Sequence, residues 1–268
     1  MVSMRDFDSK DVCSQTSTVY MLLNSPIYAG KTIIIVEGDD DRSVYKNFFI
    51  EDKVFLHPDG NCDKHAIILN DLNFKYYKRL VAIKDADFDR LNSITSKFGN
   101  LFMSDTHDLE GMVLREGVPS MLNASDSYRC ANVDISVIKE SLRDISLLRW
   151  FNNQNGFGLN FQGVNVNKPI ADYWNCVIDN TEAYVSVTYD HFQKFVEGVA
   201  TVDLDELTNG HDMFELVYIQ AKSVDKSNFP KKPFFKRLRA AYTLERFKTT
   251  SLYASLVAWP FLNGKLLE

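Results

Sequence analysis

The sequence predicts an α/β protein whose parallel sheet, flanked by helices, lies within residues 30–116 and is followed by a mainly helical second half. Two observations support this fold class. Short apolar runs rich in β-branched residues alternate with segments of helical periodicity in the first half, a pattern typical of parallel sheets with right-handed crossovers. The strand pattern then stops near residue 120. We therefore expect two domains, 1–120 and 121–268.

The clearest strand is the run TIIIV at 32–36, which is apolar without alternation. Such a composition is typical of a strand that is covered on both faces. Three aspartates at 39–41 favour a helix start, because carboxylates stabilise a helix N-terminus. The other elements expected in the first half are a helix at 16–24, strands at 54–57, 79–84 and 101–103, and helices at 63–72 and from residue 106 or 107.

The second half reads as helices separated by polar loops. Residues 135–151 form an amphipathic pattern with Ile138, Leu142 and Ile145 on successive turns. The Asn- and Gly-rich run at 152–169 predicts a loop, within which a hairpin at 157–162 is left open. Further helices are expected at 190–199, 211–221, 232–246 and 250–259.

Charge is distributed unevenly along the chain. The formal net charge is −6, yet residues 222–248 hold nine Lys or Arg and two acids. Aromatic residues are interleaved with these cations, as contacts to phosphates combined with base stacking would require. A solvated helix face whose cationic stems cover apolar surface explains the same pattern equally well. The candidate nucleic-acid-binding residues are Lys231, Lys232, Lys236, Arg237 and Arg239.

Several functional classes are excluded by what the sequence lacks. No apolar run approaches the ~18 residues that span a bilayer, so we expect a cytoplasmic protein without a membrane segment. The four cysteines form no C-x-x-C pair and the five histidines no H-x-x-x-H pair, which argues against a structural zinc site. The phosphate-binding motif of P-loop ATPases is also absent, so ATP hydrolysis is not expected.

Carboxylates follow two of the predicted strands. Glu37 comes directly after strand 32–36, and Asp85, Asp87 and Asp89 come directly after strand 79–84. The carboxyl ends of parallel strands meet at one edge of a sheet, and alternate residues of an extended segment project to the same side. Carboxylates brought together repel one another unless a divalent cation neutralises them. The sequence therefore predicts a Mg²⁺ or Mn²⁺ site.

The three aspartates also fit the start of a calcium-binding loop and an acidic turn or helix cap. An EF-hand loop needs Gly at its sixth position and Glu at its twelfth, where this chain has Arg90 and Ser96. A calcium-binding hand is thus excluded. An acidic turn or a helix cap remains an alternative for the aspartates alone, and the Glu that ends the earlier strand makes a metal site the more specific interpretation.

The segment IIIVEGD at 33–39, followed by VAIKDADFD at 81–89, resembles the Toprim domain of topoisomerases, primases and several nucleases. The Toprim resemblance covers about residues 30–116. Three further segments are similar to Toprim effectors that are encoded beside an ABC-type ATPase in phage defence. These segments are THDLE at 106–110, NGHD at 209–212 and the run from Phe247 to Trp259.

The resemblance implies a metal-dependent phosphodiesterase with a Toprim-like sheet. In that family Glu37 would act as general acid or base or as a second metal ligand, and Asp85 and Asp87 would hold the cation with help from Asp89. Asp108 and Glu110 match a later acidic pair of some Toprim nucleases, which makes Glu110 a candidate metal ligand. Helix capping explains Asp108 and Glu110 equally well.

The function implied by the resemblance is a toxic endoribonuclease of antiviral defence that cleaves transfer RNA and is restrained by a partner ATPase of the same system. One alternative keeps the metal site and makes DNA the substrate. Another is a non-catalytic module whose acidic half docks on the ATPase. The sequence is also compatible with a homodimer.

Overall fold

The computed structural model describes residues 9–60, 63–115, 133–181, 186–199, 201–224 and 229–267. The chain divides into two compact units. The sheet unit comprises residues 1–86, 95–105 and 242–268, and the helical unit comprises residues 87–94 and 106–241. This division differs from a single boundary near residue 120, because the C-terminal segment from Tyr242 belongs to the sheet unit.

The sheet unit contains four parallel strands in the order β2-β1-β3-β4. The prediction of a parallel α/β sheet is thereby confirmed. In the central pairings, Ile35 lies opposite His57 of β2 and opposite Ala82 of β3. The strands are β1 (Thr32–Val36), β2 (Val54–Pro58), β3 (Leu80–Lys84) and β4 (Leu101–Met103).

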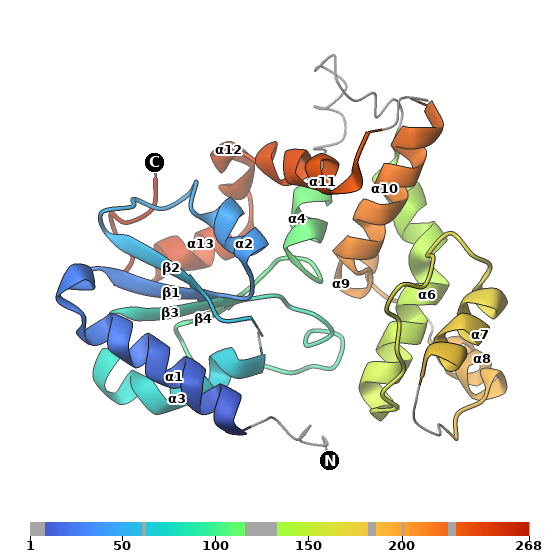
Figure 1. Ribbon diagram of the computed structural model, residues 1–268, viewed down its shortest axis with the longest axis horizontal. Coiled ribbons are helices and arrows are strands. Elements are labelled where there is room, and N and C mark those ends of the chain that lie inside the picture. Colours follow the sequence, from blue (N-terminus) through green and yellow to red (C-terminus); the bar gives the residue numbers. More distant parts are fainter. Residues whose placement is uncertain are drawn as a thin grey trace. The chain divides into compact units, whose positions relative to one another are not determined.

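Helices cover both faces of this sheet. Figure 1 shows α1 (Ser9–Asn24) and α3 (Asp63–Tyr76) on one side and α2 (Asp39–Tyr45) and α13 (Ser251–Ala258) on the other. All five residues of β1 are buried, as the uninterrupted apolar run predicts. A short 3-10 helix, Pro26–Tyr28, leads into β1. The core under α1 and α3 consists of Val19, Leu23, Ile33, Ile35, Ile68, Leu69, Leu72, Tyr76, Leu80 and Ala82.

Aromatic packing and hydrogen bonds hold the C-terminal segment, from Tyr242 onward, against the rest of the sheet unit. The ring of Phe247, in α12 (Leu244–Phe247), stacks on Phe48 with centroids 4.5 Å apart. The carboxylate of Asp105 accepts hydrogen bonds of 2.7 Å from the backbone N–H groups of Ser251 and Leu252 at the start of α13. The helix expected at 232–246 is interrupted between residues 240 and 244, where the chain passes from the helical unit into the sheet unit.

The helical unit contains α4 (Leu109–Arg115), α6 (Ile135–Asn155), α7 (Ile170–Asn180), α8 (Tyr189–Gly198), α9 (Leu204–Leu207), α10 (Gly210–Val224) and α11 (Lys231–Ala240). α6 begins at Asp134, whose carboxylate accepts from the N–H groups of Ser136 and Val137, and it ends at Gly156 with a positive φ of 65°. α7 and α9 were not expected. No strand forms at 157–162, so the hairpin left open there is absent.

None of the helices within the described residues is long and apolar enough to cross a bilayer.

Candidate functional site

Glu37 and Asp85 lie at the carboxyl edge of the sheet. Each follows its strand directly, and β1 and β3 are hydrogen-bonded neighbours. Ile35 pairs with Ala82, so the same register continued by two residues places Glu37 opposite Lys84, the residue before Asp85. Both acidic side chains are half-buried. Two carboxylates therefore lie at the ends of adjacent strands, of which β1 is buried along its whole length.

The backbone of Glu37 is fixed from the side of β2. The N–H of Asp59 donates to the carbonyl of Val36 at 3.1 Å, and the N–H of Gly60 donates to the carbonyl of Glu37 at 2.7 Å. Asp59 is itself buried, and its Oδ1 lies 3.1 Å from Nε2 of the buried His65. Gly60 has a φ of 82°, which is the conformation that glycine adopts most readily. The Asp-Gly pair after a predicted strand was the available sequence signal for this turn.

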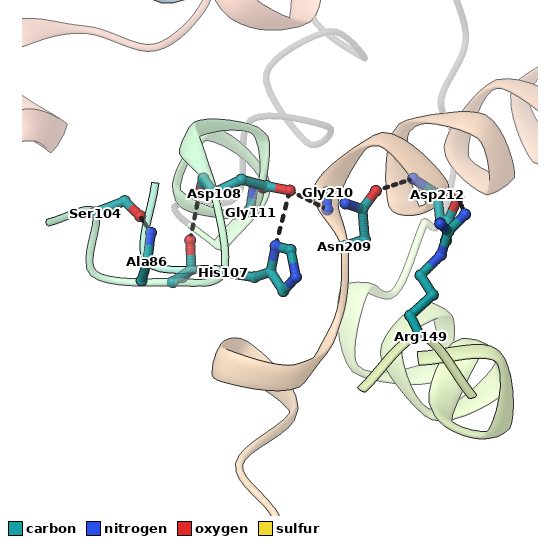
Figure 2. Close-up of polar contacts among 10 residues, drawn as sticks. Ala86, Ser104, His107, Asp108, Gly111, Arg149, Asn209, Gly210 and Asp212 are labelled. Carbon is teal, nitrogen blue, oxygen red and sulfur yellow. Dashed lines mark hydrogen bonds and ion pairs between the residues drawn. The ribbon is translucent and has the colours of Figure 1, made fainter. Parts of the chain in front are cut away.

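The backbone around Asp85 is fixed from the side of β4. Ser104, the residue after β4, donates its N–H to the carbonyl of Lys84 at 3.0 Å. Its Oγ accepts a 2.9 Å hydrogen bond from the N–H of Ala86, as Figure 2 shows. The buried Ser104 thus holds the residues on both sides of Asp85. The sequence did not single out Ser104.

Asp87 and Asp89 belong to the helical unit and do not continue an extended strand. Asp87 has a φ of 47°, and its N–H donates to the carbonyl of His107 at 2.7 Å. The carbonyl of Asp89 accepts from the N–H of Ile94, closing a turn. Aspartate tolerates this left-handed conformation better than most residues. The expectation that three aspartates alternate along an extended segment was therefore wrong.

The donor set at the sheet edge suits a hard divalent cation. Glu37 and Asp85 offer only carboxylate oxygens, and Mg²⁺ is commonly bound through one or two carboxylates together with water and substrate phosphates. Within the six described stretches of chain, no group of three or more His, Cys, Asp or Glu residues is arranged to hold a metal ion. The fit therefore rests on two carboxylates and on the oxygens that water and substrate would add.

A second polar cluster lies in the helical unit, where the segments 106–110 and 209–212 meet (Figure 2). Asp108 is buried, and its carboxylate accepts from the N–H of Gly210 at 2.7 Å and from the N–H of Gly111 at 2.8 Å. His107 Nδ1 lies 3.3 Å from Oδ2 of the same carboxylate. Burial alone would raise the pKa of Asp108, but His107, His211 and the Gly111 N–H stabilise the charge, and the net shift is downward.

Glu110 and Arg239 are bound to each other. Nε and Nη2 of Arg239 lie 2.9 Å and 2.6 Å from Oε1 of Glu110, and the two residues are 8% and 4% exposed. This ion pair joins α4 to α11 within the helical unit. Glu110 is a predicted metal ligand and Arg239 a predicted phosphate ligand, but in the structure the two side chains bind each other. Neither side chain is used in the function proposed below.

Two more titratable side chains flank the buried cluster. Nε and Nη2 of Arg149 bind the two carboxylate oxygens of Asp212 at 2.8 Å and 3.0 Å, an interaction that no local pattern revealed. His211, between Gly210 and Asp212, is exposed. The charge of Glu110 raises the pKa of His211, and Asp108 and Asp212 add to that shift.

The cationic residues predicted to bind nucleic acid in α11 differ in their surroundings. Lys231 forms an ion pair with Glu215 of α10. Lys232, Lys236 and Arg237 are exposed. Lys232 and Lys236 are thus exposed on the face of α11 where the contact with phosphates is predicted.

No protein-family model matches this chain, and no curated protein matches its sequence. The functional argument consequently depends on the residues and their geometry.

Proposed function

We propose that this protein is a divalent-cation-dependent nuclease whose reaction takes place at the carboxyl edge of the sheet. The observation that carries the proposal is the placement of Glu37 and Asp85 after two adjacent parallel strands. Ligand sites of open α/β sheets lie at this edge. The pairing of a strand-end Glu with a D-x-D segment, which resembles the Toprim domain, also supports it.

The two carboxylates have distinct roles in the proposed reaction. Asp85 would hold Mg²⁺ or Mn²⁺, and Glu37 would accept the proton of the attacking water or share the cation. The bound cation would lower the pKa of water and stabilise negative charge on the phosphate. Hydrogen bonds from Gly60 to Glu37 and from Ser104 to Lys84 keep the strand ends rigid, as in-line attack on a phosphodiester requires.

We further propose RNA, and transfer RNA in particular, as the substrate, and an ABC-type ATPase as the partner that restrains the enzyme. The resemblance to defence effectors supports both. The exposed Lys232, Lys236 and Arg237 are consistent with a polyanionic substrate, because an acidic catalytic edge needs cations elsewhere to hold phosphates.

The test compares cleavage of labelled transfer RNA and of plasmid DNA by the purified protein with Mg²⁺ or Mn²⁺. Glu37→Gln should lower RNA cleavage by about 10²- to 10⁴-fold, the usual contribution of a general acid or base. Glu51→Gln is the matched control, because Glu51 is an exposed glutamate of the same unit. Asp85→Asn should abolish stoichiometric Mn²⁺ binding in calorimetry, whereas Asp39→Asn, at an exposed aspartate, should not.

Each outcome selects among the alternatives. Glu37→Gln that cleaves as fast as the parent refutes the assigned site. Cleavage of plasmid with intact transfer RNA selects the DNA nuclease. A protein that cleaves neither substrate and binds no Mn²⁺ is the non-catalytic module.

A further inference from the structure

Exposed aromatic rings gather at the C-terminal end of α3, at the opposite edge of the sheet from Glu37 and Asp85. Phe74 is 88% exposed and Tyr77 is 39% exposed. Phe74 lies in the last turn of α3, and Tyr77 and Lys78 follow in the turn after the helix, where the N–H of Tyr77 donates to the carbonyl of Asn73. Burial of such a ring is favourable, so an almost fully exposed Phe on a folded helix indicates a surface with a binding role.

The ring of Tyr77 is held in place by its neighbours. It meets Trp259 and Phe261 edge-on, with centroid distances of 6.0 Å and 6.1 Å. Trp259 and Phe261 pack on each other at 5.2 Å. A Cβ added at Gly99 would lie 2.9 Å from the Tyr77 hydroxyl, so the segment around Gly99 abuts the same ring. All these residues belong to the sheet unit.

Lys78 lies against one of these rings, and two further lysines of the sheet unit lie against other aromatic rings. Lys78 Nζ is 5.6 Å from the centroid of Phe261, Lys75 Nζ is 5.0 Å from that of Tyr76, and Lys97 Nζ is 5.1 Å from that of Phe98. The three lysines are exposed, and Asp71 of α3 is exposed as well. In a chain of net charge −6, this local excess of positive charge favours an anionic ligand.

We propose that this α3 aromatic surface, formed by Phe74, Lys75, Tyr77, Lys78, Lys97 and Phe261, binds single-stranded RNA. Bases would stack on the exposed rings, which accept any base because every base has a π-face, and the lysines would contact phosphates. The lysines among the rings favour a polyanion over an apolar protein partner. The inference rests on the proposed function in one respect, the choice of RNA as the nucleic acid.

The position of the surface sets a length requirement on the substrate. Phe74 and Tyr77 precede β3, whereas Asp85 follows it, and β3 has five residues. At about 3.3 Å per residue, the two edges of the sheet are separated by roughly 17 Å. An RNA that contacts both edges must span at least this distance.

The experiment measures binding of a fluorescein-labelled single-stranded RNA by anisotropy in EDTA, with the Glu37→Gln protein so that no cleavage occurs. Phe74→Ala should weaken binding about 5- to 150-fold, the range for the loss of one stacked base. Lys78→Ala should reduce the slope of log K against log salt by about 0.7 in magnitude, the value for one lost phosphate contact of a single strand. Ile27→Ala and Lys46→Ala are the controls, since both side chains are exposed in the same unit outside the surface.

Unchanged affinity of Phe74→Ala, or an equal loss in Ile27→Ala, would overturn the inference. Sedimentation of the parent as a dimer that Phe74→Ala converts to a monomer would assign the surface to self-association and also overturn it. Binding is measured without a divalent cation, so it does not depend on the proposed catalytic site. Failure of the RNA-binding inference therefore appears as unchanged affinity, whereas failure of the nuclease proposal appears as cleavage that survives Glu37→Gln.

Discussion

Gly210 is the position where the structure predicts the largest effect of one added methyl group. It begins α10, and its N–H donates to the buried carboxylate of Asp108. A Cβ built at Gly210 would overlap Asp108 Oδ1 and would lie 2.5 Å from Glu110 Cβ and 2.6 Å from the N of Gly111. Two of these neighbours belong to the buried side chains of Asp108 and Glu110, and the third is backbone, so they have little freedom to move.

Opposing contributions set the size of the effect. Overpacking of a well-packed interior costs about 1–3 kcal/mol. A hydrogen bond to a charged group contributes about 1.5–3 kcal/mol, which is lost if Gly210 moves away from Asp108. Alanine is favoured over glycine in helices by at most about 1 kcal/mol, so the steric cost wins. We expect Gly210→Ala to lower the free energy of unfolding by about 2–5 kcal/mol, a large part of the total for most proteins.

Urea unfolding followed by far-UV circular dichroism measures this change. Gly198→Ala is the matched control, because Gly198 ends α8 in the same unit and a Cβ added there meets nothing within 4 Å. That variant should match the parent or gain up to about 1 kcal/mol. A Gly210→Ala protein that unfolds at the same urea concentration as the parent would show that segments 106–110 and 209–212 are not in the close contact described.

Two further predictions concern charged groups. Arg239→Met should lower the free energy of unfolding by about 3–5 kcal/mol, because Glu110 would remain buried without its partner. Arg237→Met, on the exposed face of the same helix, should change the free energy of unfolding little. Equal urea midpoints for the two variants would contradict this prediction. Burial lowers the pKa of His57 below 6.5, and the charge of Asp59 partly offsets this shift. The unfolded chain therefore binds a proton at His57 more readily than the folded protein does. Stability consequently falls as the pH drops below about 6.5. His57→Gln should therefore lose less stability than the parent between neutral and acidic pH, and parallel stability curves for the two proteins would refute that role.

The proposed catalytic edge was largely predictable because its information is local. The strands β1 and β3 are each followed directly by an acidic residue, and strand formation depends on composition over a few residues. The turn at Asp87 was not predictable in this way, because its positive φ accompanies a hydrogen bond to His107, which lies 20 residues further along the chain. Local alternation therefore gave the wrong geometry for the D-x-D segment.

The roles of the later acidic residues depended on distant partners. Asp108 meets a backbone N–H that lies 102 residues away, and Glu110 meets an arginine 129 residues away. The sequence showed buried-helix periodicity around these acids but contained no signal for which cation or donor each would face. It also treated Arg239 like the other cations of its helix, although that side chain alone turns inward to Glu110.

What the sequence determined by itself was the parallel sheet and the attachment of Glu37 and Asp85 to its strand ends, since strand formation and chain connectivity are encoded over short distances. Only the tertiary structure decided that β1 and β3 are neighbours, that the C-terminal aromatic residues complete the sheet unit and that Glu110 pairs with Arg239. These outcomes depend on which surfaces bury each other across long stretches of chain, and such pairings leave no periodic trace in the sequence.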